Sequence, residues 1–204
     1  MGTKITLVAK MAKKLPEEGP FIGVDYGAYL VAKQNKQMVL AIGDFDSVNV
    51  EQLQTIRQHS DEVIVLPREK DESDTESAIA WAREHGYEEI ELWGAMHGRA
   101  DHFLSNILLL YYQNHNLILA DENNRLQILE AGVHAISKQG FTYLSMIVLE
   151  AANVSIEGVK YPLYQRRIVP ESTLTISNEI VEDYATITIY QGKVILIQSR
   201  DATQ

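Results

Sequence analysis

The chain has 204 residues, of which 46% are hydrophobic, so it is long enough to form one large core or two smaller ones. It carries 18 basic and 28 acidic residues and no stripe of lysine and arginine, which argues against nucleic acid or an anionic membrane as a partner. It contains no cysteine, which excludes disulfides, thiolate nucleophiles and cysteine-bound zinc and fits a cytoplasmic protein.

The first 120 residues alternate between strand-like and helix-like segments. Apolar runs predict strands at residues 3–9, 21–25, 38–42, 62–66, 89–93 and 117–120. Helical spacing predicts helices at residues 27–35, 50–59, 75–85 and 101–113. The runs 38–42 and 62–66 are nearly continuous in apolar residues, which predicts strands buried on both faces. This alternation is typical of βαβ units, so we expect an α/β domain with a mainly parallel, Rossmann-like sheet.

The pattern changes at the polar run 121–124, where we expect a first domain, residues 1–122, to give way to a second, residues 123–204. Short β-rich runs then alternate with turn residues at 125–129, 142–149, 174–176, 185–190 and 194–198. The last two runs flank Gln191, Gly192 and Lys193, which predicts a terminal hairpin. The second domain is therefore predicted to be all-β.

Three turns that follow predicted strands gather carboxylates, at residues 43–47, 70–74 and 98–102. Ligands of open parallel sheets bind beyond the carboxyl ends of the strands, so we expect these turns to converge. Asp44 and Asp46 can present oxygens to a hard cation, for which Mg²⁺ is the natural candidate. Asp74 and Asp101, at the neighbouring strand ends, can complete or relay that coordination.

Other side chains in these turns leave alternatives open. Asp44 and Ser47 can simply cap the following helix. Lys70 and Arg99 can neutralise the carboxylates or bind phosphate oxygens. His102, at the start of a helix, can pack or contact a phosphate, and the position of His97 is equally ambiguous. Carboxylates, one lysine, one arginine and Mg²⁺ are sufficient for phosphoryl transfer.

The segments 43–47, 70–74 and 94–102 resemble the signature segments of the thiamin pyrophosphokinase family. Residues 25–28 resemble that family's early Asp-Gly-Gly-Ala turn, and 158–163 and 177–179 resemble its later motifs. The resemblance covers nearly the whole chain. It implies an α/β domain that binds ATP and Mg²⁺ and a C-terminal β-sandwich that binds thiamine and forms a homodimer. The implied reaction transfers a pyrophosphoryl group from ATP to the thiamine hydroxyl and releases AMP.

Carried over by position, the resemblance also implies roles for individual residues. The residues around Mg²⁺ and the ATP phosphates would be Asp44, Asp46, Asp74 and Asp101. Further nucleotide and cofactor contacts would come from Lys70, Ser73, Arg99, His102 and Asp25. Ser177 and Asn178 would help to form the thiamine pocket, which in this family lies at the dimer interface.

The chain departs from the family pattern at three positions. Tyr26 and His97 stand where the family usually has glycine, and Ser73 stands where threonine is frequent. Serine keeps the hydroxyl of threonine. Tyr26 and His97 add bulk where the backbone can approach a substrate, so nucleotide preference or turn geometry can differ.

Two other functions compete with this interpretation. The segment 44–48 after an apolar strand also matches the haloacid-dehalogenase motif, in which Asp44 would be the nucleophile of a phosphatase. That mechanism needs a downstream acidic pair, and the turn at 98–102 supplies a different pattern. The second alternative is a non-catalytic sensor that binds a nucleotide or thiamine on the same fold. The intact set of aspartates argues against it.

Overall fold

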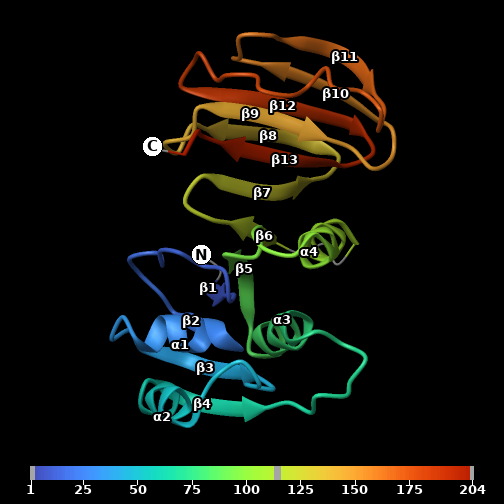
Figure 1. Cartoon of the computed structure of the whole chain (residues 1–204). Helices are drawn as coiled ribbons and strands as arrows, with labels where there is room; N and C mark the ends of the chain where they lie inside the picture. Colours follow the sequence, from blue (N-terminus) through green and yellow to red (C-terminus); the bar gives the residue numbers. More distant parts are fainter. Residues whose placement is uncertain (1–2, 113–115, 203–204) are drawn as a thin grey trace. The chain divides into compact units, whose positions relative to one another are not determined.

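The computed structural model describes residues 3–112 and 116–202, and the chain divides into two units, residues 1–121 and 122–204 (Figure 1). The sequence predicted a boundary after residue 122. Each unit has its own cluster of buried side chains, and the two are described in turn.

The described residues of unit 1, 3–112 and 116–121, form six strands and four helices. The strands are β1 (Thr3–Val8), β2 (Phe21–Val24), β3 (Met38–Gly43), β4 (Ser60–Val65), β5 (Tyr87–Trp93) and β6 (Leu117–Ala120). The helices are α1 (Tyr26–Ala32), α2 (Val50–Gln58), α3 (Asp74–Glu84) and α4 (Ala100–Tyr112). The strand order is β4-β3-β2-β1-β5-β6, and every neighbouring pair is parallel. The predicted α/β domain is therefore confirmed; the predicted helix end at Gln113 lies outside the described residues.

The two strands predicted to be buried on both faces differ. In β3, Leu40, Ala41 and Ile42 are all at most 3% exposed although they alternate between the faces of the sheet. The prediction for residues 62–66 is wrong, because β4 is the edge strand and Val65 is 58% exposed. An apolar run does not distinguish a central strand from an edge strand, because both can be rich in Val and Ile.

The direction of the strand order reverses at β1, since β2, β3 and β4 lie to one side of it and β5 and β6 to the other. Such a reversal is where open parallel sheets bind ligands. Close backbone packing at this edge requires glycine. A Cβ on Gly27 would lie 1.9 Å from the Val8 oxygen, and a Cβ on Gly43 would lie 2.9 Å from Asp25 Cα. The ends of β1, β2 and β3 therefore meet closely.

The residues that cap α2 and α3 test the alternative that side chains of the first acidic turn only cap the following helix. Asn49 caps α2: its side chain accepts a hydrogen bond from Gln52 N, and the Gln52 side chain accepts one from Asn49 N. The alternative that Asp44 and Ser47 cap this helix is thus wrong. Ser73 caps α3 in the same way, together with Glu76.

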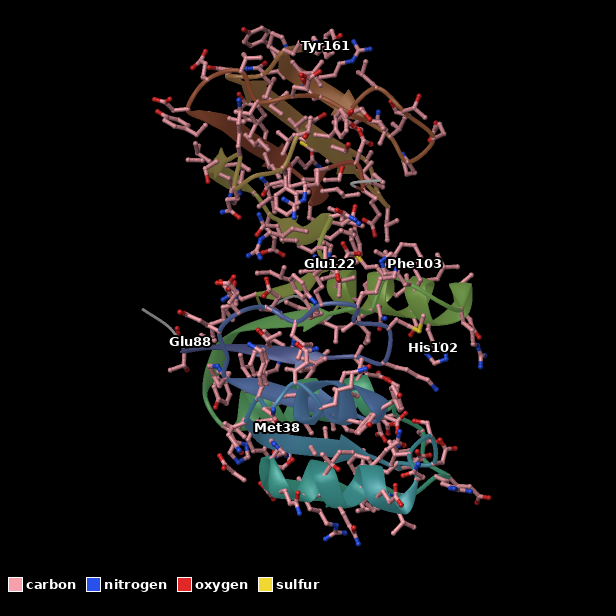
Figure 2. The ribbon with its side chains drawn as sticks, turned by 60° about the vertical axis from the view of Figure 1, so that its left-hand side comes forward. Met38, Glu88, His102, Phe103, Glu122 and Tyr161 are labelled. Carbon is pink, nitrogen blue, oxygen red and sulfur yellow. The ribbon has the colours of Figure 1, made fainter. Side chains whose placement is uncertain are left out.

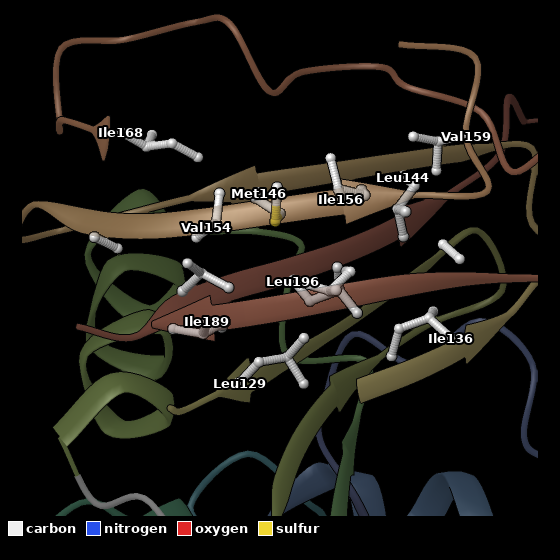
Figure 3. Close-up of a cluster of buried hydrophobic side chains, with 14 of the residues drawn as sticks. Leu129, Ile136, Leu144, Met146, Val154, Ile156, Val159, Ile168, Ile189 and Leu196 are labelled. Carbon is white, nitrogen blue, oxygen red and sulfur yellow. The ribbon is translucent and has the colours of Figure 1, made fainter. Parts of the chain in front are cut away.

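Unit 2 contains seven strands and no helix among its described residues, 122–202. They are β7 (Asn124–Leu129), β8 (Gly132–Ser137), β9 (Tyr143–Ile147), β10 (Ala152–Glu157), β11 (Leu163–Ile168), β12 (Tyr184–Gln191) and β13 (Val194–Ser199). Within the unit they pair antiparallel in the orders β7-β13-β9 and β11-β10-β12-β8. Side chains from both groups, among them Met146, Leu196, Val154 and Ile189, form one buried cluster (Figure 3). The predicted all-β domain is confirmed.

The predicted terminal hairpin is wrong. Strand β12 pairs with β10 and β8, whereas β13 pairs with β7 and β9. The chain passes between them at Gly192, whose φ is +83° and where a Cβ would lie 2.9 Å from the Ala151 oxygen. A glycine-containing turn between two apolar runs can connect strands of different sheets as readily as it closes a hairpin.

The predicted run 174–176 is also not a strand. Thr175 lies beside β9, where its carbonyl accepts from Met146 N at 2.9 Å and its hydroxyl donates to the Met146 carbonyl at 2.6 Å. Strands β8, β10 and β11 were not predicted. Strand β11 in particular is an edge strand with exposed polar residues, so it lacks the apolar alternation on which the prediction depends.

Among the helices of the described residues, none combines the length and the apolar character needed to cross a membrane.

Candidate active site

Three carboxylates from the ends of two adjacent strands meet at the carboxyl edge of the sheet in unit 1. Asp25 follows β2, and Asp44 and Asp46 follow β3. One oxygen of each lies within 4.8 Å of the others. Within residues 3–112 and 116–202, none of the three forms an ion pair. The sequence predicted Asp44 and Asp46 as metal ligands and assigned Asp25 only to the nucleotide-binding set. We call these three residues the carboxylate group.

Asp25 is held in a conformation that residues other than glycine rarely adopt, with φ +50° and ψ −123°. Its N–H donates to the Ile42 carbonyl at 2.9 Å, and its Oδ2 accepts from Ser47 Oγ at 2.8 Å. Its Oδ1 is buried and accepts no hydrogen bond within the described residues. A buried carboxylate oxygen without a partner is costly, so this atom fits the requirement for a cation.

Asp44 and Asp46 are separated by a residue that fixes their geometry. Phe45 has φ +54°, is 6% exposed and packs into the core cluster that includes α1 and α2. Asp46 N donates to Asp44 Oδ1 at 3.0 Å. The buried ring therefore anchors the turn and leaves the two carboxylates at the sheet edge.

The second acidic turn forms its own ion pair. Lys70 Nζ lies 2.5 Å from Asp74 Oδ1, and both side chains are largely buried. Ser73 Oγ accepts from Glu76 N and donates to Glu76 Oε2, so the hydroxyl stabilises the start of α3. Asp74 lies outside the carboxylate group, and its role at a metal stays a prediction.

The third acidic turn also pairs internally. Arg99 Nε donates to Asp101 Oδ1 at 3.1 Å, and Arg99 Nη2 donates to Asp101 Oδ2. The hydrogen bonds from Arg99 and from His102 N hold the pKa of Asp101 down at about 2. Asp101 also lies outside the carboxylate group. His102, in the first turn of α4, is exposed (Figure 2).

One further pair in unit 1 was missed by the sequence analysis. His97 Nε2 lies 3.2 Å from Asp121 Oδ2, and the Asp121 side chain is only 1% exposed. Asp121 directly follows β6, as Asp25 and Asp44 follow β2 and β3. Its position after a predicted strand was therefore the feature of the sequence that could have identified Asp121 as a site residue. His97, at a position where glycine is usual, thus fastens the turn after β5 to the end of β6.

The two residues predicted to bind thiamine lie in unit 2 and differ in their surroundings. Asn178 is buried: its Oδ1 accepts from Tyr161 N and Glu179 N, and its Nδ2 donates to the Tyr161 carbonyl. It thereby joins segments 158–163 and 177–179. Ser177 has φ +58° and is exposed, and its N–H donates to Ser145 Oγ at 2.8 Å. Within the part of the chain that the structure describes, the Ser177 hydroxyl forms no hydrogen bond.

Comparisons with known proteins agree with this arrangement. The family model for the thiamin pyrophosphokinase catalytic domain matches residues 12–120, and the model for the vitamin B1 binding domain of the same enzymes matches residues 133–194. A thiamine pyrophosphokinase of Bacillus subtilis is 34% identical over 201 residues, which cover 96% of this chain and 94% of the relative. The chain belongs to the thiamin pyrophosphokinase family. It is an enzyme, a transferase of the kinase type that uses ATP and makes thiamine diphosphate.

Solved structures of this family share the whole fold. The thiamine pyrophosphokinase of Bacillus subtilis superposes with a TM-score of 0.86 at 31% identity, covering 98% of this chain and 100% of that chain. A thiamin pyrophosphokinase family protein of Enterococcus faecalis gives a TM-score of 0.87 at 28% identity, with the same coverage. The thiamin pyrophosphokinase of Candida albicans, at 15% identity and a TM-score of 0.80, shares the fold.

Proposed function

We propose that the chain transfers a pyrophosphoryl group from ATP to the thiamine hydroxyl in a reaction that requires Mg²⁺ and releases AMP. The observation that carries the metal requirement is the carboxylate group, whose members Asp25, Asp44 and Asp46 form no ion pair within the described residues. Mg²⁺ prefers oxygen ligands and is commonly held by one or two carboxylates together with substrate phosphates. When bound, it supplies positive charge that stabilises the transferring phosphates.

The basic residues of the other two turns complete the proposed phosphate site. Arg99 uses Nε and Nη2 for Asp101 and its side chain is 74% exposed, so its remaining nitrogen can donate to a phosphate oxygen. Lys70 can share its ammonium protons between Asp74 and a phosphate. In this arrangement Asp74 and Asp101 hold the charged side chains of Lys70 and Arg99 in place and do not coordinate the metal directly.

Ser73 and His102 contribute less directly to this proposal. The Ser73 hydroxyl donates to Glu76, so a phosphate contact requires it to exchange that partner. The exposed ring of His102 lies one residue from the Arg99–Asp101 pair and can reach the same phosphates.

We also propose that thiamine binds at unit 2 through Ser177 and Asn178, and that the enzyme is a homodimer in the cytoplasm. The vitamin B1 binding model at residues 133–194 and the exposed Ser177 hydroxyl support the thiamine site. The use of ATP supports the cytoplasmic location. An uncharged strip on unit 2 supports the dimer: its exposed or half-buried residues alternate along two paired strands, at Val133, Ala135, Thr186, Thr188 and Tyr190.

The deciding experiment incubates purified protein with ATP, thiamine and Mg²⁺ and separates the products by chromatography. We expect thiamine diphosphate and AMP in equal amounts and only with metal. Asp25→Asn and Asp46→Asn should each lower kcat by about 100-fold or more, because each removes a charge at the metal. Asp61→Asn, an exposed acid at the start of β4, is the matched control.

Other products would contradict the proposal. ADP with thiamine monophosphate would indicate ordinary kinase chemistry, and phosphate released without thiamine would favour a phosphatase with Asp44 as nucleophile. Bound thiamine without turnover would favour a sensor. Full activity in Asp25→Asn would remove Asp25 from the metal site.

A further inference from the structure

We propose that Lys10 is an additional ATP-binding residue, whose ammonium group contacts the phosphates and is positioned by the ring of Tyr26. The inference rests on the proposed function, because it places a cation beside the same phosphate site. Lys10 lies outside the segments that resemble the family motifs, and Tyr26 stands where the family usually has glycine.

The position of Lys10 in the fold brings it to the ligand-binding edge. Strand β1 ends at Val8, and residues 9–20 lead to the parallel neighbour β2. Ala9 N donates to the Trp93 carbonyl at 2.9 Å, and a Cβ on Gly94 would lie 2.5 Å from Ala12 Cα. The beginning of this loop therefore packs against the turn after β5, at the point where the strand order reverses.

Side-chain hydrogen bonds from Trp93 and Lys36 hold the rest of this loop in place within unit 1. Trp93 Nε1 donates to the Lys14 carbonyl at 2.6 Å. Lys36 Nζ donates to the Pro16 carbonyl at 3.0 Å and to the Glu17 carbonyl at 2.5 Å. Since both halves are held, Lys10 extends from a fixed backbone, which lowers the entropic cost of using it as a ligand contact.

A cation–π contact brings the Lys10 ammonium to the first residue of α1. Lys10 Nζ lies 5.9 Å from the centre of the Tyr26 ring, which itself packs edge-on against Tyr29 at 5.6 Å. Tyr26 directly follows Asp25. The tight packing of Gly27 on Val8 keeps the start of α1 against the end of β1. A glycine at position 26 would offer no ring to hold the lysine.

The charge of Lys10 is available to an anion. Its side chain is exposed, and within residues 3–112 and 116–202 it forms no ion pair, either with the carboxylate group or with any other acid. Lys10 follows β1 at the same edge of the sheet as the carboxylate group, which suits a metal ion. In a chain with a net charge of −10, an ammonium without an ion pair at this edge matches the phosphates of a nucleotide. The contact would be electrostatic and would not read the base.

The test compares Lys10→Met with Lys33→Met, an exposed lysine that follows the far end of α1. We expect Lys10→Met to raise the KM for ATP about tenfold and to leave the KM for thiamine unchanged. The inhibition constant of inorganic tripolyphosphate, which lacks a base, should rise by the same factor. Lys10→Arg and Tyr26→Phe should retain most of the affinity for ATP, and Tyr26→Leu should lose part of it. Lys33→Met should have the same KM for ATP as the parent.

Three results would overturn the assignment. An unchanged KM for ATP in Lys10→Met, with active parent enzyme, would remove Lys10 and leave the proposed function standing. A changed KM for ATP with unchanged tripolyphosphate inhibition would place Lys10 at the base. A raised requirement for Mg²⁺ with unchanged ATP affinity would mean that Lys10 acts on the carboxylates. If the parent forms no thiamine diphosphate, calorimetric binding of tripolyphosphate to the same variants still decides the role of Lys10.

Discussion

Single side chains at the candidate site fall into two electrostatic classes. Asp74 and Asp101 each have a basic partner, Lys70 and Arg99 respectively. The three members of the carboxylate group have none within the described residues. Carboxylates that lie this close repel one another unless a cation or protons compensate them. The paired aspartates need no such compensation, so the carboxylate group is where a metal has most to contribute.

The Arg99–Asp101 pair makes a prediction about pH. The pKa of Asp101 is lowered from 3.8 to about 2, chiefly by the hydrogen bond from Arg99. A lowered folded-state pKa stabilises the folded state fully above the unfolded value of 3.8, and that contribution is lost as the pH falls towards 2. Asp101 is therefore fully ionised at neutral pH. We expect Arg99→Gln to raise its pKa towards 3.8, measured by NMR titration of the carboxyl carbon.

Arg57→Gln, which alters an exposed arginine in the last turn of α2, is the control and should leave the Asp101 pKa at about 2. A pKa that stays near 2 in Arg99→Gln would assign the shift to the backbone hydrogen bond from His102 instead.

At the scale of helices and strands, the parallel sheet could be predicted because its strands are apolar runs separated by helical spacing. The position of Asp44 and Asp46 followed from the same rule, since both come directly after β3. The role of Asp25 could not be predicted in this way. It depends on a positive φ and on one unpartnered buried oxygen, which arise from tertiary packing around Gly43.

The β-rich unit was harder to predict, because partners in antiparallel sheets can lie far apart in sequence. Strand β12 has the alternation expected of a hairpin arm, yet its partners are β8 and β10. Strand β11 lies at an edge and its polar residues are exposed, so its sequence does not show the alternation of apolar and polar residues that a half-buried strand has. Sequence pattern reports which face of a strand is buried, whereas pairing is decided by the whole core.

The segments that carry Ser177 and Asn178 allow structural and ligand roles to be separated. We expect Asn178→Ala to lower the free energy of unfolding by about 3 kcal/mol, because two N–H groups and one carbonyl lose their buried partner. Ser177→Ala should change it by less than about 0.5 kcal/mol, because the side chain is exposed, but should raise the KM for thiamine. Urea unfolding and steady-state kinetics measure the two effects.

Equal stability of both variants would contradict the structural role of Asn178 and would make it a direct thiamine contact. A KM for thiamine that does not respond to Ser177→Ala, or an effect confined to ATP, would show that thiamine binds elsewhere.

At the scale of the whole molecule, the proposed homodimer determines whether the thiamine site is complete. The resemblance to the family implies a pocket that borrows residues from both subunits, so loss of the dimer should also impair thiamine use. The uncharged strip on β8 and β12 is the surface on which this can be tested. Val133, 71% exposed and opposite Thr188 in the register, lies within it.

We expect the parent to sediment at twice the chain mass of 23.0 kDa and Val133→Asp to shift towards the single-chain mass. In a two-fold symmetric interface the substitution would occur twice and bury two carboxylates without partners, which is costly. Val65→Asp, at an exposed position of β4 in unit 1, is the matched control and should remain dimeric. Because dissociation follows mass action, kcat/KM for thiamine in Val133→Asp should recover as the protein concentration rises.

Two results would contradict this prediction. If Val133→Asp stays dimeric and keeps the kinetics of the parent, the interface lies on another face of the molecule. If the parent is a monomer with full activity, one chain supplies the whole thiamine pocket.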